Sequence, residues 1–139
     1  MRDAMSGIHP LLALAPVVVT DNTEQLSAAI DVKGYEGLTF LIVTGTLADA
    51  DATFAVEVRE CDTSGGTYTA VADADLVGTE ALAGFTFSDD GETRKVGYKG
   101  TKRYVKCAIT PSGNTGNAPL AVIALLSHAA RRPTANPPV

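Results

Sequence analysis

The regular spacing of short runs rich in Val, Ile, Thr, Phe and Tyr constrains this chain most. Clusters of Gly, Asp, Asn and Pro separate these runs at intervals of about 8–12 residues, and helical periodicity is almost absent. This pattern is typical of a β-sandwich or β-barrel. It predicts strands at residues 14–20, 26–32, 38–46, 53–60, 67–72, 84–87, 93–99, 103–110 and 119–127.

The length of the chain limits it to one such unit. A chain of 139 residues has room for a single hydrophobic core, because typical domains contain roughly 100–150 residues. We therefore predict an all-β fold, a single antiparallel β-sandwich of jelly-roll-like type at residues 13–128. Residues 1–12 are expected to form an extended N-terminal arm. Residues 129–139 are expected to form a C-terminal tail that is rich in proline and therefore neither helix nor interior strand.

Two of the predicted strands are apolar on both faces. Residues 53–59 alternate between apolar and polar side chains, as a half-buried strand does, whereas residues 38–43 and 120–126 are apolar on both sides. Strands of the second kind lie in the centre of a fold or present their second face to another subunit. Pro16 lacks an N–H group, so the first strand is predicted to be an edge strand or an arm that lies on a neighbour.

The charge of the chain excludes one class of partner. The formal net charge is −5, whereas a protein that binds free nucleic acid needs an excess of Lys and Arg. We therefore expect no direct nucleic-acid partner. The apolar stretch at residues 8–12 is short and Pro10 interrupts it, so we expect neither a secretory signal nor a membrane-spanning segment.

Strand parity predicts the state of the two cysteines. Cys107 shares its strand face with inward residues, whereas Cys61 follows outward residues, and side chains on opposite faces cannot be bridged. Two free thiols are therefore expected. No C-x-x-C pair is present, and His9 and His128 have no ligand-like spacing to either cysteine, so no metal site is expected.

The remaining polar groups give no indication of catalysis. The acidic pairs at 49/51 and 73/75 lack the central Gly and the closing Glu of a helix-loop-helix calcium site, and are expected to be solvated turn carboxylates. The nucleophile motif G-x-S-x-G is absent. We expect no catalytic residue, no cofactor and no enzymatic activity.

A basic segment spans residues 94–106 and contains Tyr98 and Tyr104. Cations interleaved with aromatic rings occur on sheets that bind single-stranded nucleic acid. The simpler interpretation is a hairpin whose outer face contacts an acidic neighbour. In that hairpin the inward residues are Val96, Tyr98, Val105 and Cys107, and the outward residues are Lys95, Lys99 and Lys106.

Several segments resemble small structural proteins of tailed bacteriophages. They are TYTAVADADLVG at 67–78, FAVEVRE at 54–60, KVGYKG at 95–100 and KRYVK at 102–106. The resemblance runs from about residue 14 to residue 128. It implies a virion protein of the head module, and within that module a capsid decoration, or cement, protein. No catalytic residue comes with it.

The resemblance also implies partners and a location. The expected partner is the major capsid protein, with self-association on the capsid, for example as a trimer. The protein would be made in the host cytoplasm and lie on the capsid surface of the virion. Alternatives are a head-fibre base, a tail-tube or tail-completion protein and, from another class, a carbohydrate-binding or adhesion module.

The residues predicted to contact partners lie in the N-terminal arm, the first strand, the basic segment and the tail. They are Leu11, Leu12, Leu14, Val17, Val19, Lys95, Lys99, Lys102, Arg103, Arg131, Arg132 and Pro133.

Overall fold

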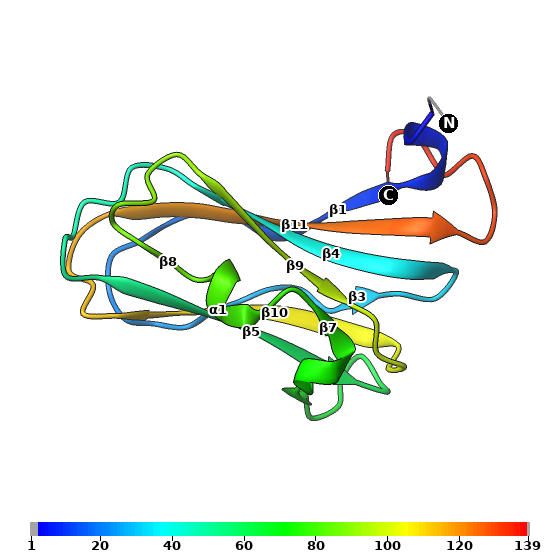
Figure 1. The fold of residues 1–139 in the computed structure, drawn as a ribbon, viewed down its shortest axis with the longest axis horizontal. Coiled ribbons are helices and arrows are strands. Elements are labelled where there is room, and N and C mark those ends of the chain that lie inside the picture. Colours follow the sequence, from blue (N-terminus) through cyan, green and yellow to red (C-terminus); the bar gives the residue numbers. More distant parts are fainter. Residues whose placement is uncertain (1–2, 139) are drawn as a thin grey trace.

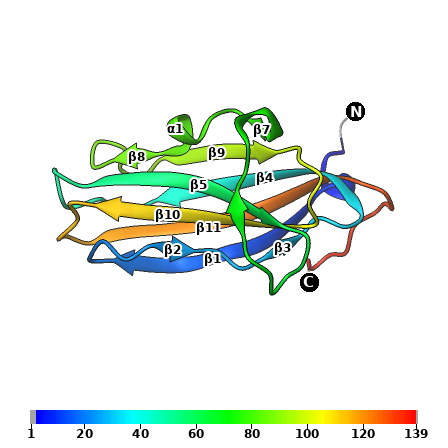
Figure 2. The same cartoon turned by 90° about the horizontal axis from the view of Figure 1, so that it is seen from below.

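The computed structural model describes residues 3–138, so residues 1, 2 and 139 of the predicted arm and tail lie outside the described part. Two antiparallel sheets pack face to face and confirm the predicted all-β sandwich (Figures 1 and 2). Apolar side chains fill the space between the two layers, which is where the burial of apolar area stabilises a sandwich.

The first sheet, called sheet A, has the strand order β1-β11-β4-β9-β7. Its strands are β1 (His9–Val19), β4 (Tyr35–Thr44), β7 (Leu76–Val77), β9 (Thr93–Tyr98) and β11 (Ala118–Ala129). The long central strands β11 and β4 pair over most of their length. They are the two strands predicted to be apolar on both faces.

The second sheet, called sheet B, is built on β5 (Thr53–Cys61) and β10 (Tyr104–Ser112). Short strands pair along their edges: β2 (Gln25–Leu26), β3 (Ile30–Asp31), β6 (Thr69–Ala70) and β8 (Phe85–Thr86). Two 3-10 turns, η1 (Met5–Gly7) and η2 (Asp73–Asp75), and one short helix, α1 (Glu80–Ala83), complete the described elements.

Helix α1 closes a gap along the free edge of β5. Thr79 caps the helix by accepting a hydrogen bond from the N–H of Leu82. The Glu80 carboxylate accepts a hydrogen bond from the N–H of Val58 at 2.7 Å, between the points where β8 and β6 pair with β5. A backbone donor that no neighbouring strand reaches is thereby satisfied.

The predicted strands differ from the observed ones chiefly at the edges. The strand predicted at 14–20 begins at His9, so residues 9–12 of the predicted arm pair with β11. The strand predicted at 26–32 divides into β2 and β3, because Ser27 and Ala28 bond to Cys107 and Ala13, in different sheets. The long interior strands agree with the prediction to within three residues.

The predicted hairpin at 94–106 is not formed. Strand β9 pairs with β4 and β7 in sheet A, whereas β10 pairs with β5 in sheet B, so residues 99–103 connect the two layers (Figure 1). The predicted inward residues Val96, Tyr98, Val105 and Cys107 are nevertheless all buried. Alternation along a strand sets the inward face whichever strand is the neighbour, so the parity was right and the pairing was wrong.

Tyr98 links the two sheets at this connection. Its hydroxyl donates a hydrogen bond of 2.6 Å to Glu60 of β5 and accepts one of 2.9 Å from the N–H of Lys102. Burial and the bond to Glu60 raise the pKa of Tyr98, which keeps the hydroxyl protonated as the donor.

The first and last described segments of the chain lie side by side at one end of sheet A (Figure 1). We call residues 3–8 and 130–138 together the clasp. The N–H of Thr134 donates to the carbonyl of Ser6 at 3.0 Å, and its hydroxyl donates to the carbonyl of Ile8. The N–H of Ala130 donates to the carbonyl of Gly34. The tail is therefore attached to the start of the chain.

Candidate protein interaction surface

The outer face of sheet A is mainly aliphatic over β1, β11 and β4, with Thr39 the outward polar residue among those paired across all three strands, whereas β9 adds Thr93 and Lys95. Residues paired across neighbouring strands point to the same side, so the register aligns Leu12 with Ile123 and Ile123 with Leu41. The same argument places the other outward residues. We call the following set the aliphatic face: Pro10, Leu12, Val18, Leu41, Val43, Pro119, Ala121, Ile123 and Leu125.

This face is open to solvent. Leu12 is 60% exposed and Val18 is 54% exposed, and the other members are partly exposed. Within residues 3–138, no helix or loop lies over the middle of β1, β11 and β4, and the clasp stands at one end (Figure 1). Strands β1 and β11 contain no Asp, Glu, Lys or Arg. An uncharged and uncovered aliphatic sheet face is typical of a protein–protein contact.

The aliphatic face is uneven along the strands. At the end away from the clasp, a depression of about 380 Å³ lies between Pro16, Val18, Val43, Gly45 and Pro119. The larger side chains of Leu12, Ile123 and Leu125 lie toward the clasp.

A wider cleft of about 630 Å³ adjoins the face beyond β4. Lys95 and Lys99 line it together with Val77 and Leu82. Leu82 is 74% exposed. Exposed apolar and cationic side chains therefore border the aliphatic face on its β9 side.

The outer face of sheet B has the opposite character. Arg59 forms an ion pair with Glu24 at 2.7 Å and another with Glu57. Lys102 pairs with Asp62 at 2.7 Å. These charges neutralise one another on the surface, so this face has little apolar area to bury against a partner.

Two tyrosines lie on the sheet B side, and cations cover their rings. The Nζ atom of Lys106 is 4.3 Å from the centroid of the Tyr68 ring, and the Cζ atom of Arg103 is 5.1 Å from that of Tyr104. Such cation–π contacts occupy the ring face that a sugar would stack on.

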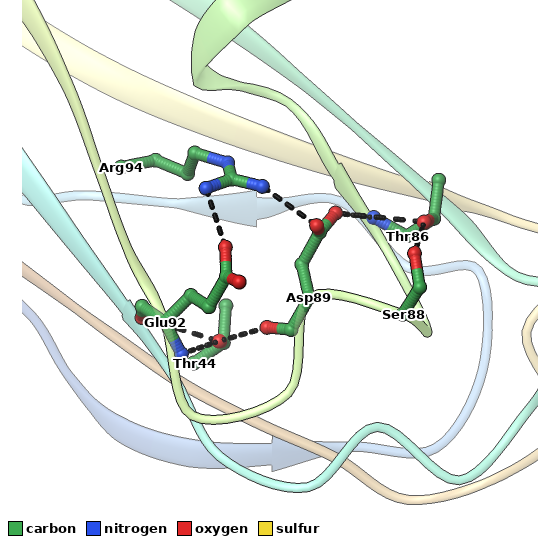
Figure 3. Close-up of polar contacts among 6 residues, drawn as sticks. All are labelled: Thr44, Thr86, Ser88, Asp89, Glu92 and Arg94. Carbon is green, nitrogen blue, oxygen red and sulfur yellow. Dashed lines mark hydrogen bonds and ion pairs between the residues drawn. The ribbon is translucent and has the colours of Figure 1, made fainter.

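The acidic turns hold backbone groups. Asp89 accepts a hydrogen bond from the N–H of Thr86 at 2.7 Å and pairs with Arg94, which also contacts Glu92 (Figure 3). The backbone carbonyl of Asp89 accepts from the Thr44 hydroxyl. The bond to Thr86 and the Arg94 guanidinium hold the pKa of Asp89 below its ordinary value. Among residues 3–138, no group of three or more His, Cys, Asp or Glu is placed to hold a metal ion.

The cysteines have the predicted orientation. Cys107 is buried between the sheets, and burial raises the pKa of its thiol to about 12. Cys61 pairs with Tyr104 across the sheet and is half-buried, and both thiols are free.

The predicted apolar contact residues lie on two sides of β1. Leu12 points outward, whereas Leu11, Leu14 and Val17 pack against the core and Val19 is part of it. The pairing shifts between Leu12 and Leu14 and again between Leu14 and Val17, and such bulges change which side chains face outward. These four residues therefore lie on the core side of β1, and their predicted contact with a partner stays a prediction.

The predicted basic contact residues are spread over the molecule. Lys95 and Lys99 are exposed on the β9 side of sheet A, whereas Arg103 makes two hydrogen bonds to Asp31, at 2.9 and 2.8 Å. In the clasp are Arg131, Arg132 and Pro133, all exposed, with the Arg132 guanidinium beside Gly7. The structure thus does not bring the twelve predicted residues into one surface.

Most residues of the aliphatic face were not among the twelve predicted contact residues. The sequence feature that indicates this face is the apolar character of residues 38–43 and 120–126 on both sides of their strands, and the outward side of these strands is the one that the structure exposes.

The described part of the chain contains no helix that is long and apolar enough to cross a bilayer.

The comparisons with known proteins give structural neighbours. No protein-family model matches this sequence, and no curated protein matches it. Among solved structures, the PBSX exported protein XepA superposes with a TM-score of 0.61 at 11% identity over 98% of this chain. Infectious bursal disease virus, Gx strain, gives a TM-score of 0.54 at 12% identity over 91% of this chain.

A third neighbour belongs to a carbohydrate-active enzyme. The CBM22-1-GH10 modules of Clostridium thermocellum xylanase 10B, complexed with xylohexaose, give a TM-score of 0.52 at 13% identity over 89% of this chain. This chain covers only 42% of the XepA chain, 33% of the viral chain and 26% of the xylanase chain. At such identities the likeness shows a shared β-sandwich fold.

Proposed function

We propose that this chain is a structural protein of a tailed-phage virion, and within it a decoration protein that binds the assembled major capsid lattice and stabilises the head. The observation that carries the proposal is the open aliphatic face on β1, β11 and β4. A protein that reinforces a shell acts by burying surface against its neighbours, and this face supplies uncharged surface for that purpose.

Three further points support this role. The sequence resembles small phage structural proteins. Two of the structural neighbours that share the fold are the PBSX exported protein XepA and a chain of infectious bursal disease virus. The clasp holds residues 3–8 and 130–138 together at one end of sheet A. The proposal includes no catalytic step, no cofactor and no membrane contact.

The test is a binding assay with expanded, undecorated phage capsids. The protein should co-sediment with them to a saturating ratio that matches the lattice, and should raise the capsid melting temperature. Ala121→Lys, which puts a charge in the aliphatic face, should weaken decoration of the capsid by tenfold or more, because the contact that this face makes on the lattice would then bury an unpaired charge.

Ala55→Lys is the matched control. Ala55 is an outward alanine of a central strand in the other sheet, beside Glu57. This variant should bind capsids as the wild type does. If the wild-type protein fails to bind capsids at any concentration tested, the decoration role is wrong, and assays with purified tails and head fibres follow.

A carbohydrate-binding module is the second candidate. It is favoured by the outward positions of Tyr68 and Tyr104 and by the fold shared with the xylanase modules. Lys106 and Arg103 cover these rings, which disfavours sugar stacking. Saturable binding in a glycan array that is lost in Tyr68→Ala would support this second function.

A further inference from the structure

The aliphatic face needs an occupant, and we infer that it is a second copy of this chain. The two copies would pack face to face, related by a twofold axis that lies between the faces and runs perpendicular to the strands. This inference rests on the proposed function and narrows it, because the aliphatic face would join two copies on the lattice and the pair would contact the capsid through its other surfaces.

Charge distribution favours a second copy. Lys95, at the β9 margin, is aligned with Leu41, and the nearest part of the face is otherwise uncharged. Two such faces can be pressed together without burying a charge, because the aliphatic face contains no charged residue and Lys95 lies outside it, on β9. A partner with a charged contact surface would have to give up its solvation without gaining an opposite charge.

The unevenness of the face determines the orientation. One end has the larger side chains of Leu12, Ile123 and Leu125, and the other end has the depression between Val43 and Pro119. A twofold axis across the strands places the larger end of each copy over the depression of the other. Contacts of this kind are self-complementary and close at two copies.

The position of the clasp excludes the opposite arrangement. Figure 1 shows the clasp above the end of sheet A where β1 begins and β11 ends. Two copies with the same ends together would bring their clasps into collision. With opposite ends together, each clasp lies beyond the far end of its partner's sheet, next to the turn that contains Gly45.

The area of the face determines the strength of association. Neighbouring strands lie about 4.8 Å apart and each residue extends a strand by about 3.4 Å. Over their paired length, β1, β11 and β4 therefore cover an area of about 400 Å² per copy. A standard stable interface buries about 800 Å² per partner. The pair should therefore be reversible, with a Kd of roughly 10–100 µM, and would form readily at the high local concentration of a decorated lattice.

The first experiment is sedimentation velocity of the full chain from about 5 to 500 µM. The weight-average mass should rise from monomer toward dimer across this range. Leu12→Lys should weaken association by tenfold or more, and it should not disturb folding because Leu12 is 60% exposed. Leu26→Lys is the control, since Leu26 is an exposed leucine of sheet B, and its dimerisation should equal that of the wild type.

The second experiment tests the orientation by cross-linking. In a Cys61→Ser background, Ala121→Cys lies near the proposed axis and should be joined to its counterpart by a short bis-maleimide. Leu125→Cys lies far from the axis and should not be joined to itself. Self-cross-linking of Leu125→Cys without that of Ala121→Cys would overturn the orientation.

The outcomes separate the inference from the proposed function. A protein that stays monomeric at 500 µM but saturates capsids overturns the inference and leaves the decoration role standing. A protein that dimerises but does not bind capsids overturns the decoration role alone. Dimerisation that is unchanged in Leu12→Lys would mean that another surface makes the contact.

Discussion

The hydrogen bonds of Tyr98 should be measurable in the stability of the domain. Tyr98 lies in sheet A and is 4% exposed, and its hydroxyl reaches Glu60 of sheet B and the N–H of Lys102. Tyr98→Phe keeps the ring in the core and removes both hydrogen bonds. One of them is to a carboxylate and contributes more than a neutral bond, so the loss should total about 2 kcal/mol.

This loss converts into two measurable shifts. A chain of 139 residues has an unfolding entropy of about 0.3 kcal/mol per degree, so the melting temperature should fall by about 7 °C. The urea midpoint should fall by about 1 M with an unchanged slope. Both are read by circular dichroism or intrinsic fluorescence.

The control and the refutation follow from the same geometry. Tyr104→Phe changes a half-buried ring on the outer side of sheet B and should cost less than about 0.5 kcal/mol. A double-mutant cycle of Tyr98→Phe with Glu60→Ala should give a coupling of about 1 kcal/mol. Zero coupling would show that the two sheets are not held together through this pair.

Two other predictions concern ionisation and thiol chemistry. Arg103 holds the pKa of Asp31 below its ordinary value, and Arg59 does so for Glu24. A carboxyl with a lowered folded pKa stabilises the fold above its unfolded pKa and ceases to do so as pH falls through the folded value, so the melting temperature should drop below about pH 4.5. A melting temperature that is flat from about pH 6 to about pH 2.5 would contradict this. Iodoacetamide should label Cys61 in the folded protein and should reach Cys107 only after unfolding. Burial blocks access to the Cys107 thiol and raises its pKa to about 12. Mass spectrometry of the two cysteine-containing peptides measures which thiol is labelled.

Alternation along single strands allowed much of the core to be predicted. Val96, Val105 and Cys107 were assigned inward from their own neighbours in the sequence, and all three are buried. Alternation is a local property of the chain, so the inward assignment of these residues was correct although the predicted pairing of β9 with β10 was wrong.

Pairing partners and bulges were not predictable in the same way. Nothing in residues 99–103 marks a crossing between sheets, because a short polar connection serves a hairpin equally well. The two register shifts in β1 lie in its pairing with β11, and between them Leu14 packs against the core although plain alternation from Leu12 would turn it outward. Choice of partner depends on the whole fold, and no single segment contains that information.

The candidate surface was predictable in kind and not in detail. Residues 38–43 and 120–126 indicated a second apolar face, and that face is the exposed side of sheet A. The aromatic and basic segment is the more conspicuous feature of the sequence, yet Arg103 and Lys102 form ion pairs with Asp31 and Asp62. Only the folded chain shows which charges already have partners.

The clasp makes this chain a candidate for circular permutation. Because Thr134 is bonded to Ser6, a linker of a few residues would join the two ends without crossing the domain. New ends could be opened at Gly65, in an exposed turn where an added side chain would meet nothing within 4 Å. Such a permuted chain would present a fused peptide from the sheet B side and leave the outer face of sheet A free.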